Sequence, residues 1–270
     1  MKKIFIFPRV IVPVFAILAM SLTACANTNS RRQVDTVSST EFTASGAVSE
    51  EDTCVKTPTL KKESRPKKVS ILGDSYSTFE GYVPSNFISW YKPIPKKGRV
   101  TDVTDVDQTW WKIFIDKNGY ELEQNNSYSG STICNTGYGK KDYTDQSFVT
   151  RRTDLGNPDL ILVFGGTNDS WADSPIGEYV WDGWTKQQLY AYRPATSYLL
   201  SELQKLYPNA EVVVLINDMV KPEITESTIE ICNHYGVKYV QLHDIAKKSD
   251  HPDAKGMIQI VDQLEAVLQK

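Results

Sequence analysis

Short apolar runs recur along residues 67–270 and alternate with longer segments whose apolar residues repeat every three or four positions. Three of the runs, 69–72, 159–164 and 211–216, are almost wholly apolar, which is typical of strands buried on both faces of a sheet. The longer segments predict helices, because their spacing places apolar side chains on one helix face. The other predicted strands are 121–125, the least apolar, and 237–242; the predicted helices are 108–118, 186–206, 222–235 and 252–268.

Alternating strands and helices predict a parallel sheet covered on both faces. The expected fold is therefore a three-layer α/β/α sandwich around a five-stranded parallel sheet, a flavodoxin-like arrangement. Pro194 falls inside the predicted helix 186–206, where a proline predicts a kink. The segments 76–108 and 130–158 are too long for simple connections, and long loops in such folds are often functional.

Residues 1–24 have the pattern of an export signal. Two lysines precede an apolar stretch whose uninterrupted part, residues 10–20, is too short to span a bilayer. The stretch ends in Leu-Thr-Ala-Cys at 22–25, which resembles the bacterial lipobox. That resemblance implies cleavage before Cys25, lipidation of Cys25 and an exported lipoprotein anchored to a membrane. The alternative is an ordinary signal peptide with a chance cysteine.

Residues 25–66 are rich in Ser, Thr, Glu and Lys, which predicts a flexible linker after the lipidated cysteine. The folded domain is accordingly expected over 67–270. The linker ends in a basic run, interpreted as solvated, with weak attraction to anionic lipid head groups as the alternative. Lysine and arginine number 30 against 33 acidic residues, so the chain is not basic enough to indicate a nucleic-acid partner.

The four cysteines do not indicate a metal site, because none lies in a Cys-x-x-Cys pair or near a histidine cluster. In an exported protein, disulfides can form. Cys134 and Cys232 are expected either to form a bridge or to be buried free thiols.

The residues that follow the predicted strands are those of a serine esterase. Ligands of open α/β sheets bind outside the carboxyl ends of the strands. Ser75 follows the first strand, Gly130 the second, Asn168 the third and His251 the fifth. Together they offer a nucleophile, oxyanion donors and a base.

These residues lie in four short blocks that resemble, in content and order, those of the SGNH hydrolases, also called the GDSL esterase/lipase superfamily. The blocks are Gly-Asp-Ser at 73–75, the glycine at 130, Gly-Thr-Asn-Asp at 166–169 and the histidine at 251. The resemblance implies that Ser75 is the nucleophile and His251 the general base. It also implies an oxyanion hole formed by the N–H groups of Ser75 and Gly130 and the amide of Asn168. No metal or organic cofactor is implied.

One position departs from the family pattern. The family usually has aspartate three residues before the catalytic histidine, where this chain has Lys248. Asp250 is one candidate to orient the His251 imidazole; a backbone carbonyl, leaving a Ser–His dyad, is the other. Asp74 and Asp169 are expected to hydrogen-bond within loops and not to react.

The tryptophans bear on the substrate. All six lie outside the apolar strands, and Trp171, Trp181 and Trp184 follow the Asn168 loop. Aromatic rings beside a catalytic edge are flat surfaces on which sugar rings stack, although such residues also pack loops against a sheet. Members of the SGNH family that remove acetyl groups from glycans are common, and an exported enzyme with a lipid anchor suits a polymer. The resemblance therefore implies, as the first hypothesis, an esterase that removes acetyl or other small acyl groups from polysaccharide. The alternatives are a lipase, thioesterase or arylesterase with the same machinery, and a non-catalytic glycan-binding lipoprotein.

Overall fold

The computed structural model of the chain describes residues 65–269. The predicted export signal, the lipidation site Cys25 and the linker up to residue 64 lie outside these residues. Across 65–269, no helix is both long enough and apolar enough to span a bilayer.

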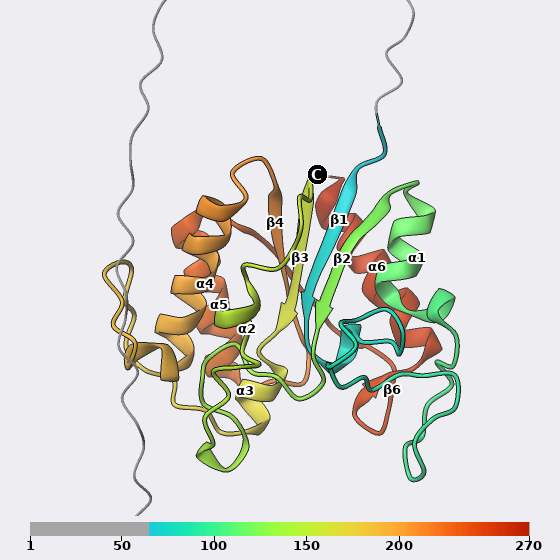
Figure 1. The fold of residues 1–270 in the computed structure, drawn as a ribbon, viewed down its shortest axis with the longest axis horizontal. Helices are drawn as coiled ribbons and strands as arrows, with labels where there is room; N and C mark the ends of the chain where they lie inside the picture. Colours follow the sequence, from blue (N-terminus) through green and yellow to red (C-terminus); the bar gives the residue numbers. More distant parts are fainter. Residues whose placement is uncertain (1–64, 270) are drawn as a thin grey trace, which may run out of the picture. The chain divides into compact units, whose positions relative to one another are not determined.

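Five parallel strands form the central sheet in the order β2-β1-β3-β4-β5 (Figure 1). This confirms the predicted five-stranded parallel sheet and its flavodoxin-like order. The strand order reverses between β1 and β3, and ligands of such sheets bind beside this reversal, outside the carboxyl ends. The strands are β1 (Lys68–Gly73), β2 (Glu121–Ser127), β3 (Leu160–Gly165), β4 (Glu211–Ile216) and β5 (Lys238–Gln241).

Helices cover both faces of the sheet (Figure 1). On one face lie α1 (Trp110–Lys117) and α6 (Ala254–Leu268), and on the other α2 (Phe148–Arg151), α4 (Tyr192–Leu206) and α5 (Pro222–Tyr235). At the carboxyl ends of the strands lie two short elements, the helix α3 (Thr167–Trp171) and a hairpin of β6 (Lys247–Lys248) and β7 (His251–Pro252). Single 3₁₀ turns complete the fold: η1 (Ser75–Ser77), η2 (Val106–Gln108), η3 (Tyr138–Lys140) and η4 (Gln188–Tyr190).

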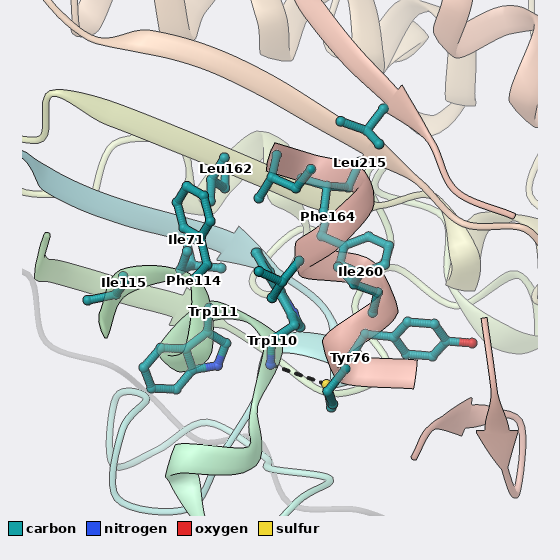
Figure 2. Close-up of a cluster of buried hydrophobic side chains, with 14 of the residues drawn as sticks. Ile71, Tyr76, Trp110, Trp111, Phe114, Ile115, Leu162, Phe164, Leu215 and Ile260 are labelled. Carbon is teal, nitrogen blue, oxygen red and sulfur yellow. Dashed lines mark hydrogen bonds between the residues drawn. The ribbon is translucent and has the colours of Figure 1, made fainter. Parts of the chain in front are cut away.

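The two faces of β3 show why its sequence is apolar throughout. Leu162 and Phe164 pack toward α1 and α6, whereas Ile161 and Val163 pack toward α4 and α5. Successive side chains of a strand point to opposite faces, so a strand between two helix layers needs apolar residues at every position. Figure 2 shows the core between the sheet and the helices α1 and α6. There Trp110 of α1 and Ile260 of α6 meet side chains of β1, β3 and β4.

The structure corrects the sequence analysis at α4. The helix begins at Tyr192 and not near 186, and a 3₁₀ turn occupies 188–190. Pro194 is the third residue of the helix, where the missing N–H has no intrahelical partner to lose, so the predicted kink does not arise. The short elements α2, α3 and β6–β7 were not predicted, because two to five residues are too few to show a periodic pattern.

Candidate active site

Ser75 lies two residues after the end of β1, as the first residue of η1. The chain turns sharply here because Gly73 has no side chain: a Cβ at that position would come within 2.6 Å of the Cβ of Ser77. Asp74 caps the turn, since its Oδ1 accepts the N–H of Tyr76 at 3.0 Å. The sharp turn presents Ser75 at the carboxyl end of β1.

His251 reaches Ser75 from the far end of the chain. It opens β7 of the β6–β7 hairpin, and its Nε2 lies 2.8 Å from the Oγ of Ser75. Both residues are almost fully buried, with 3% of Ser75 and 5% of His251 exposed. The two residues that the sequence analysis proposed as nucleophile and base are therefore in hydrogen-bond contact.

The other ring nitrogen of His251 contacts a backbone carbonyl and not the carboxylate of Asp250. Its Nδ1 lies 2.9 Å from the carbonyl oxygen of Ser249, within a tight turn in which Ser249 and Asp250 have φ of 49° and 59°. A carbonyl only accepts, so Nδ1 carries the proton and Nε2 is free to accept the proton of Ser75. Of the two candidates, the backbone carbonyl is therefore the group that orients the imidazole, and the prediction of Asp250 as a catalytic residue is wrong. Asp250 takes part through its own carbonyl, which accepts the hydroxyl of Tyr76 at 2.6 Å.

The backbone N–H groups of Ser75 and Gly130, which follow the carboxyl ends of β1 and β2, have no hydrogen-bond partner within residues 65–269. Gly130 follows β2, the neighbour of β1, in a left-handed conformation with φ of 87° that glycine adopts without strain. N–H groups left unpaired at the edge of a sheet are suited to bind an oxyanion.

Asn168 lies in the first turn of α3, after β3. Its Nδ2 donates to the carbonyl of Ser131 at 3.0 Å and lies 3.4 Å from the Oδ2 of Asp74, at the long limit of a hydrogen bond. Its Oδ1 accepts the hydroxyl of Tyr138 at 2.7 Å. Within the described residues, one amide hydrogen of Asn168 is thus held by the Ser131 carbonyl, and the other makes only the long contact with Asp74.

The two buried carboxylates of the motif blocks hold loops, as expected. Asp169 accepts the N–H groups of Ile133 at 2.7 Å and Cys134 at 3.1 Å, which fixes the loop that follows Gly130. Burial raises the pKa of Asp169 to about 6 and the pKa of Asp74 to about 7.

Arg151, at the end of α2, is a residue of this site that the sequence analysis missed. It is 5% exposed, and its guanidinium donates to the carbonyl of Gly73 at 3.1 Å, to the Oγ of Ser131 at 2.8 Å and to the Oδ1 of Asn126 at 3.1 Å. It thereby joins the ends of β1 and β2 to the loop that carries Gly130. Burial lowers its pKa to about 9, which leaves it charged at neutral pH. An isolated arginine without a motif gives no sequence signal for such a role.

Replacing this guanidinium is expected to be costly. Arg151→Met leaves several buried acceptors without a donor, so we expect the free energy of unfolding to fall by about 3 kcal/mol. Urea denaturation measures the change, with Arg65→Met as the matched control. Arg65 forms an exposed ion pair with Asp159, and such pairs contribute roughly 0–1 kcal/mol. Equal losses in the two variants would show that Arg151 does not organise the site.

Aromatic rings surround His251. The indole of Trp90 lies flat on the imidazole, and Trp171 meets it edge-on with ring centroids 6.1 Å apart. Trp171 is 37% exposed. Of the three tryptophans that follow the Asn168 loop, only Trp171 contacts His251; Trp181 packs on α5 and Trp184 on α4.

Neither a metal centre nor a disulfide is formed by the residues that the structure describes. In that part of the chain, no group of three or more His, Cys, Asp or Glu side chains could hold a metal ion. Cys134 and Cys232 are buried free thiols, which decides between the two alternatives that the sequence left open.

Comparison with known families matches residues 67–268 to a family described as GDSL-like lipase/acylhydrolase. A crystal structure described as a GDSL-like lipase, from Bacteroides ovatus ATCC 8483, is 53% identical, with a TM-score of 0.75. The match covers 76% of this chain and 99% of that one. A second, from Bacteroides uniformis ATCC 8492, is 54% identical, with a TM-score of 0.74 and coverage of 76% and 97%.

A more distant likeness concerns the fold alone. A family two carbohydrate esterase from Clostridium thermocellum, solved in complex with cellohexaose, is 16% identical, with a TM-score of 0.52 and coverage of 76% of this chain and 65% of that one. Among curated proteins, none matches the chain.

Proposed function

The chain belongs to the GDSL-like lipase/acylhydrolase (SGNH) family, a family of ester hydrolases, and from this premise we propose that it is a serine esterase for small acyl esters, chiefly acetyl esters of polysaccharide. One observation carries the proposal: Nε2 of His251 lies 2.8 Å from the Oγ of Ser75, while its Nδ1 is held by the Ser249 carbonyl. A buried hydroxyl in contact with a neutral imidazole is the arrangement that activates a serine for attack on a carbonyl.

In the proposed reaction, the Oγ of Ser75 attacks the ester carbonyl as its proton passes to Nε2 of His251. The N–H groups of Ser75 and Gly130 and the freer amide hydrogen of Asn168 bind the negative oxygen that develops. The C–O bond to the alcohol then breaks, and the alcohol leaves with the proton from Nε2. Water attacks the acyl-serine and gives its proton to Nε2, and the acid leaves as the serine regains its hydrogen.

The surroundings of Ser75 favour a small acyl group and a bulky alcohol. Ser75 is 3% exposed, and the rings of Tyr76 and Trp90 pack against His251, so the serine lies in closely packed surroundings that favour a short acyl group. Trp171, which is partly exposed and lies against His251, offers a flat surface with a polar edge on which a sugar ring can stack. The fold is also that of a carbohydrate esterase solved with cellohexaose.

The alternatives differ in what they predict for this site. A lipase or thioesterase with the same machinery needs space for a long acyl chain. The hypothesis of a non-catalytic glycan-binding protein depended on the missing aspartate, and the contact between His251 and the Ser249 carbonyl weakens that argument. The export signal and the lipid anchor at Cys25 stay predictions from the sequence.

Two measurements on the full chain test the proposal. A fluorophosphonate probe is expected to form one adduct, located at Ser75 by peptide mass spectrometry. We expect kcat/KM for p-nitrophenyl acetate to exceed that for p-nitrophenyl octanoate by at least about 10-fold, since a long acyl chain would have to displace packed side chains, which costs about 1–3 kcal/mol. Acetate release from acetylated xylan then tests the polymer. Preference for octanoate would support the lipase alternative, and no adduct with no hydrolysis would support the binding protein.

A further inference from the structure

The indole of Trp90 covers one face of the His251 imidazole. The two ring centroids are 3.5 Å apart and the ring planes differ by 4°. The guanidinium carbon of Arg99 lies 4.1 Å from the centre of the same indole. Two groups this close to one ring cannot share a face, so the indole is clamped between Arg99 and His251.

The long loop 76–108 fixes Trp90 in this position. The N–H of Trp90 donates to the Oγ1 of Thr78, directly after η1, at 2.8 Å. The Arg99 guanidinium donates back to the carbonyl of Trp90 at 3.0 Å, so it holds the backbone and the ring of the same residue. The loop is therefore tied to the turn that carries Ser75.

The same loop is tied to the hairpin that carries His251. The N–H of Val100 donates to the Oγ of Ser249 at 3.2 Å. Asp102 accepts the ammonium of Lys248 at 2.5 Å and the N–H of Ala254 at 2.9 Å. Lys248, at the position where the family usually has its acid, thus faces the loop and not the imidazole.

We propose that Trp90 is a positioning residue for His251, whose stacked indole supplies the orienting constraint that position 248 lacks. The inference rests on the proposed esterase function. A hydrogen bond from Nδ1 to a neutral carbonyl fixes one ring atom, yet it allows the ring to tilt and is weaker than a bond to a carboxylate. A ring stacked face to face fixes the plane of the imidazole, and so the direction of the Nε2 lone pair toward Ser75.

The indole of Trp90 is also one of the groups that bury the imidazole, and burial affects the protonation of the base. Burial lowers the pKa of His251 to about 4, and the charges of Arg99 and Lys247 act in the same direction. The Ser249 carbonyl and Asp250 oppose them. The other polar or aromatic groups that face the ring are Ser75, Tyr76, Tyr91 and Trp171.

His251 is neutral above pH 4. The acid limb of the pH profile, where kcat/KM falls because the base becomes protonated, is therefore expected near pH 4. Without Trp90, water reaches the ring, and the limb moves up toward the ordinary histidine pKa of about 6.5.

The test compares Trp90→Ala, Trp90→Phe and Trp184→Ala in the full chain, with p-nitrophenyl acetate from pH 3.5 to 8 and released nitrophenol measured by chromatography. Trp184 is a half-buried tryptophan that packs on α4, away from His251, and it controls for the loss of a large ring. For Trp90→Ala we expect kcat to fall about 10- to 100-fold with little change in KM, and the acid limb to rise by about one pH unit or more. Trp90→Phe is expected to recover most of kcat and the low limb, and Trp184→Ala to leave both as in the unsubstituted chain.

An unchanged kcat and acid limb in Trp90→Ala would overturn the inference. So would a loss of kcat that tracks the melting temperature equally in all three variants, or a loss that phenylalanine does not rescue. Failure of the esterase proposal has a different signature: the unsubstituted chain then shows no hydrolysis and no adduct at Ser75. The rate of fluorophosphonate labelling, which needs no bound ester, is a second readout and is expected to fall in Trp90→Ala.

Discussion

Ser75→Ala is expected to lower kcat for p-nitrophenyl acetate by about 10⁴- to 10⁶-fold. Without Oγ no acyl-enzyme forms, and His251 has no hydroxyl to deprotonate at the 2.8 Å contact. What remains is attack by water on an ester held near the unpaired N–H groups, which is a slower reaction than acyl transfer to serine. The measurement is kcat from initial rates on protein freed of host esterases.

Ser77→Ala is the matched control for this experiment. Ser77 is buried in the same 3₁₀ turn, two residues further on, and its Oγ accepts the indole N–H of Trp110 at 3.2 Å. Its loss is expected to lower the free energy of unfolding by roughly 1–3 kcal/mol, because a buried donor loses its acceptor, while kcat stays within a few-fold. Residual activity of Ser75→Ala above about 1% would show that the nucleophile lies elsewhere. An equal loss in Ser77→Ala would show that the loss comes from damage to the turn and not from the missing Oγ of Ser75.

The sheet and the approximate place of the site could be predicted because their signals are local. A strand between two helix layers must be apolar at each position, and 159–164 and 211–216 show this directly. Once the strands are placed, the topology brings their carboxyl ends together, so Ser75 and Asn168 are expected near each other without any knowledge of side-chain conformation.

The details that decide the chemistry could not be predicted, because they depend on backbone conformation and on loops without a periodic pattern. Whether Asp250 or a carbonyl orients His251 depends on two consecutive non-glycine residues with positive φ, which no sequence rule indicates. Trp90 reaches His251 from a loop of irregular sequence. Arg151 donates to the backbone carbonyl of Gly73, which is distant in the sequence. Every residue has such a carbonyl, so the sequence does not show which one an arginine binds.

The amide of Asn168 is expected to act on the transition state and not on substrate binding. Asn168→Ala removes a donor that would meet the negative oxygen only as it forms, so we expect kcat to fall about 100- to 1000-fold with KM within a factor of about three. The second amide hydrogen is suited to this role because, within residues 65–269, its one contact, with the Oδ2 of Asp74, is 3.4 Å long. The measurement is the separate determination of kcat and KM with p-nitrophenyl acetate.

Tyr138→Phe separates this role from a merely structural one. It removes the hydrogen bond to the Oδ1 of Asn168 but leaves both amide hydrogens in place. Because the carbonyl of Ser131 still holds the amide at 3.0 Å, we expect Tyr138→Phe to lower kcat by no more than about 10-fold. If the two variants lost kcat equally, or if Asn168→Ala changed KM alone, Asn168 would be a residue of the loop or of the substrate site. A large loss in Asn168→Ala alone would support its place in the oxyanion hole.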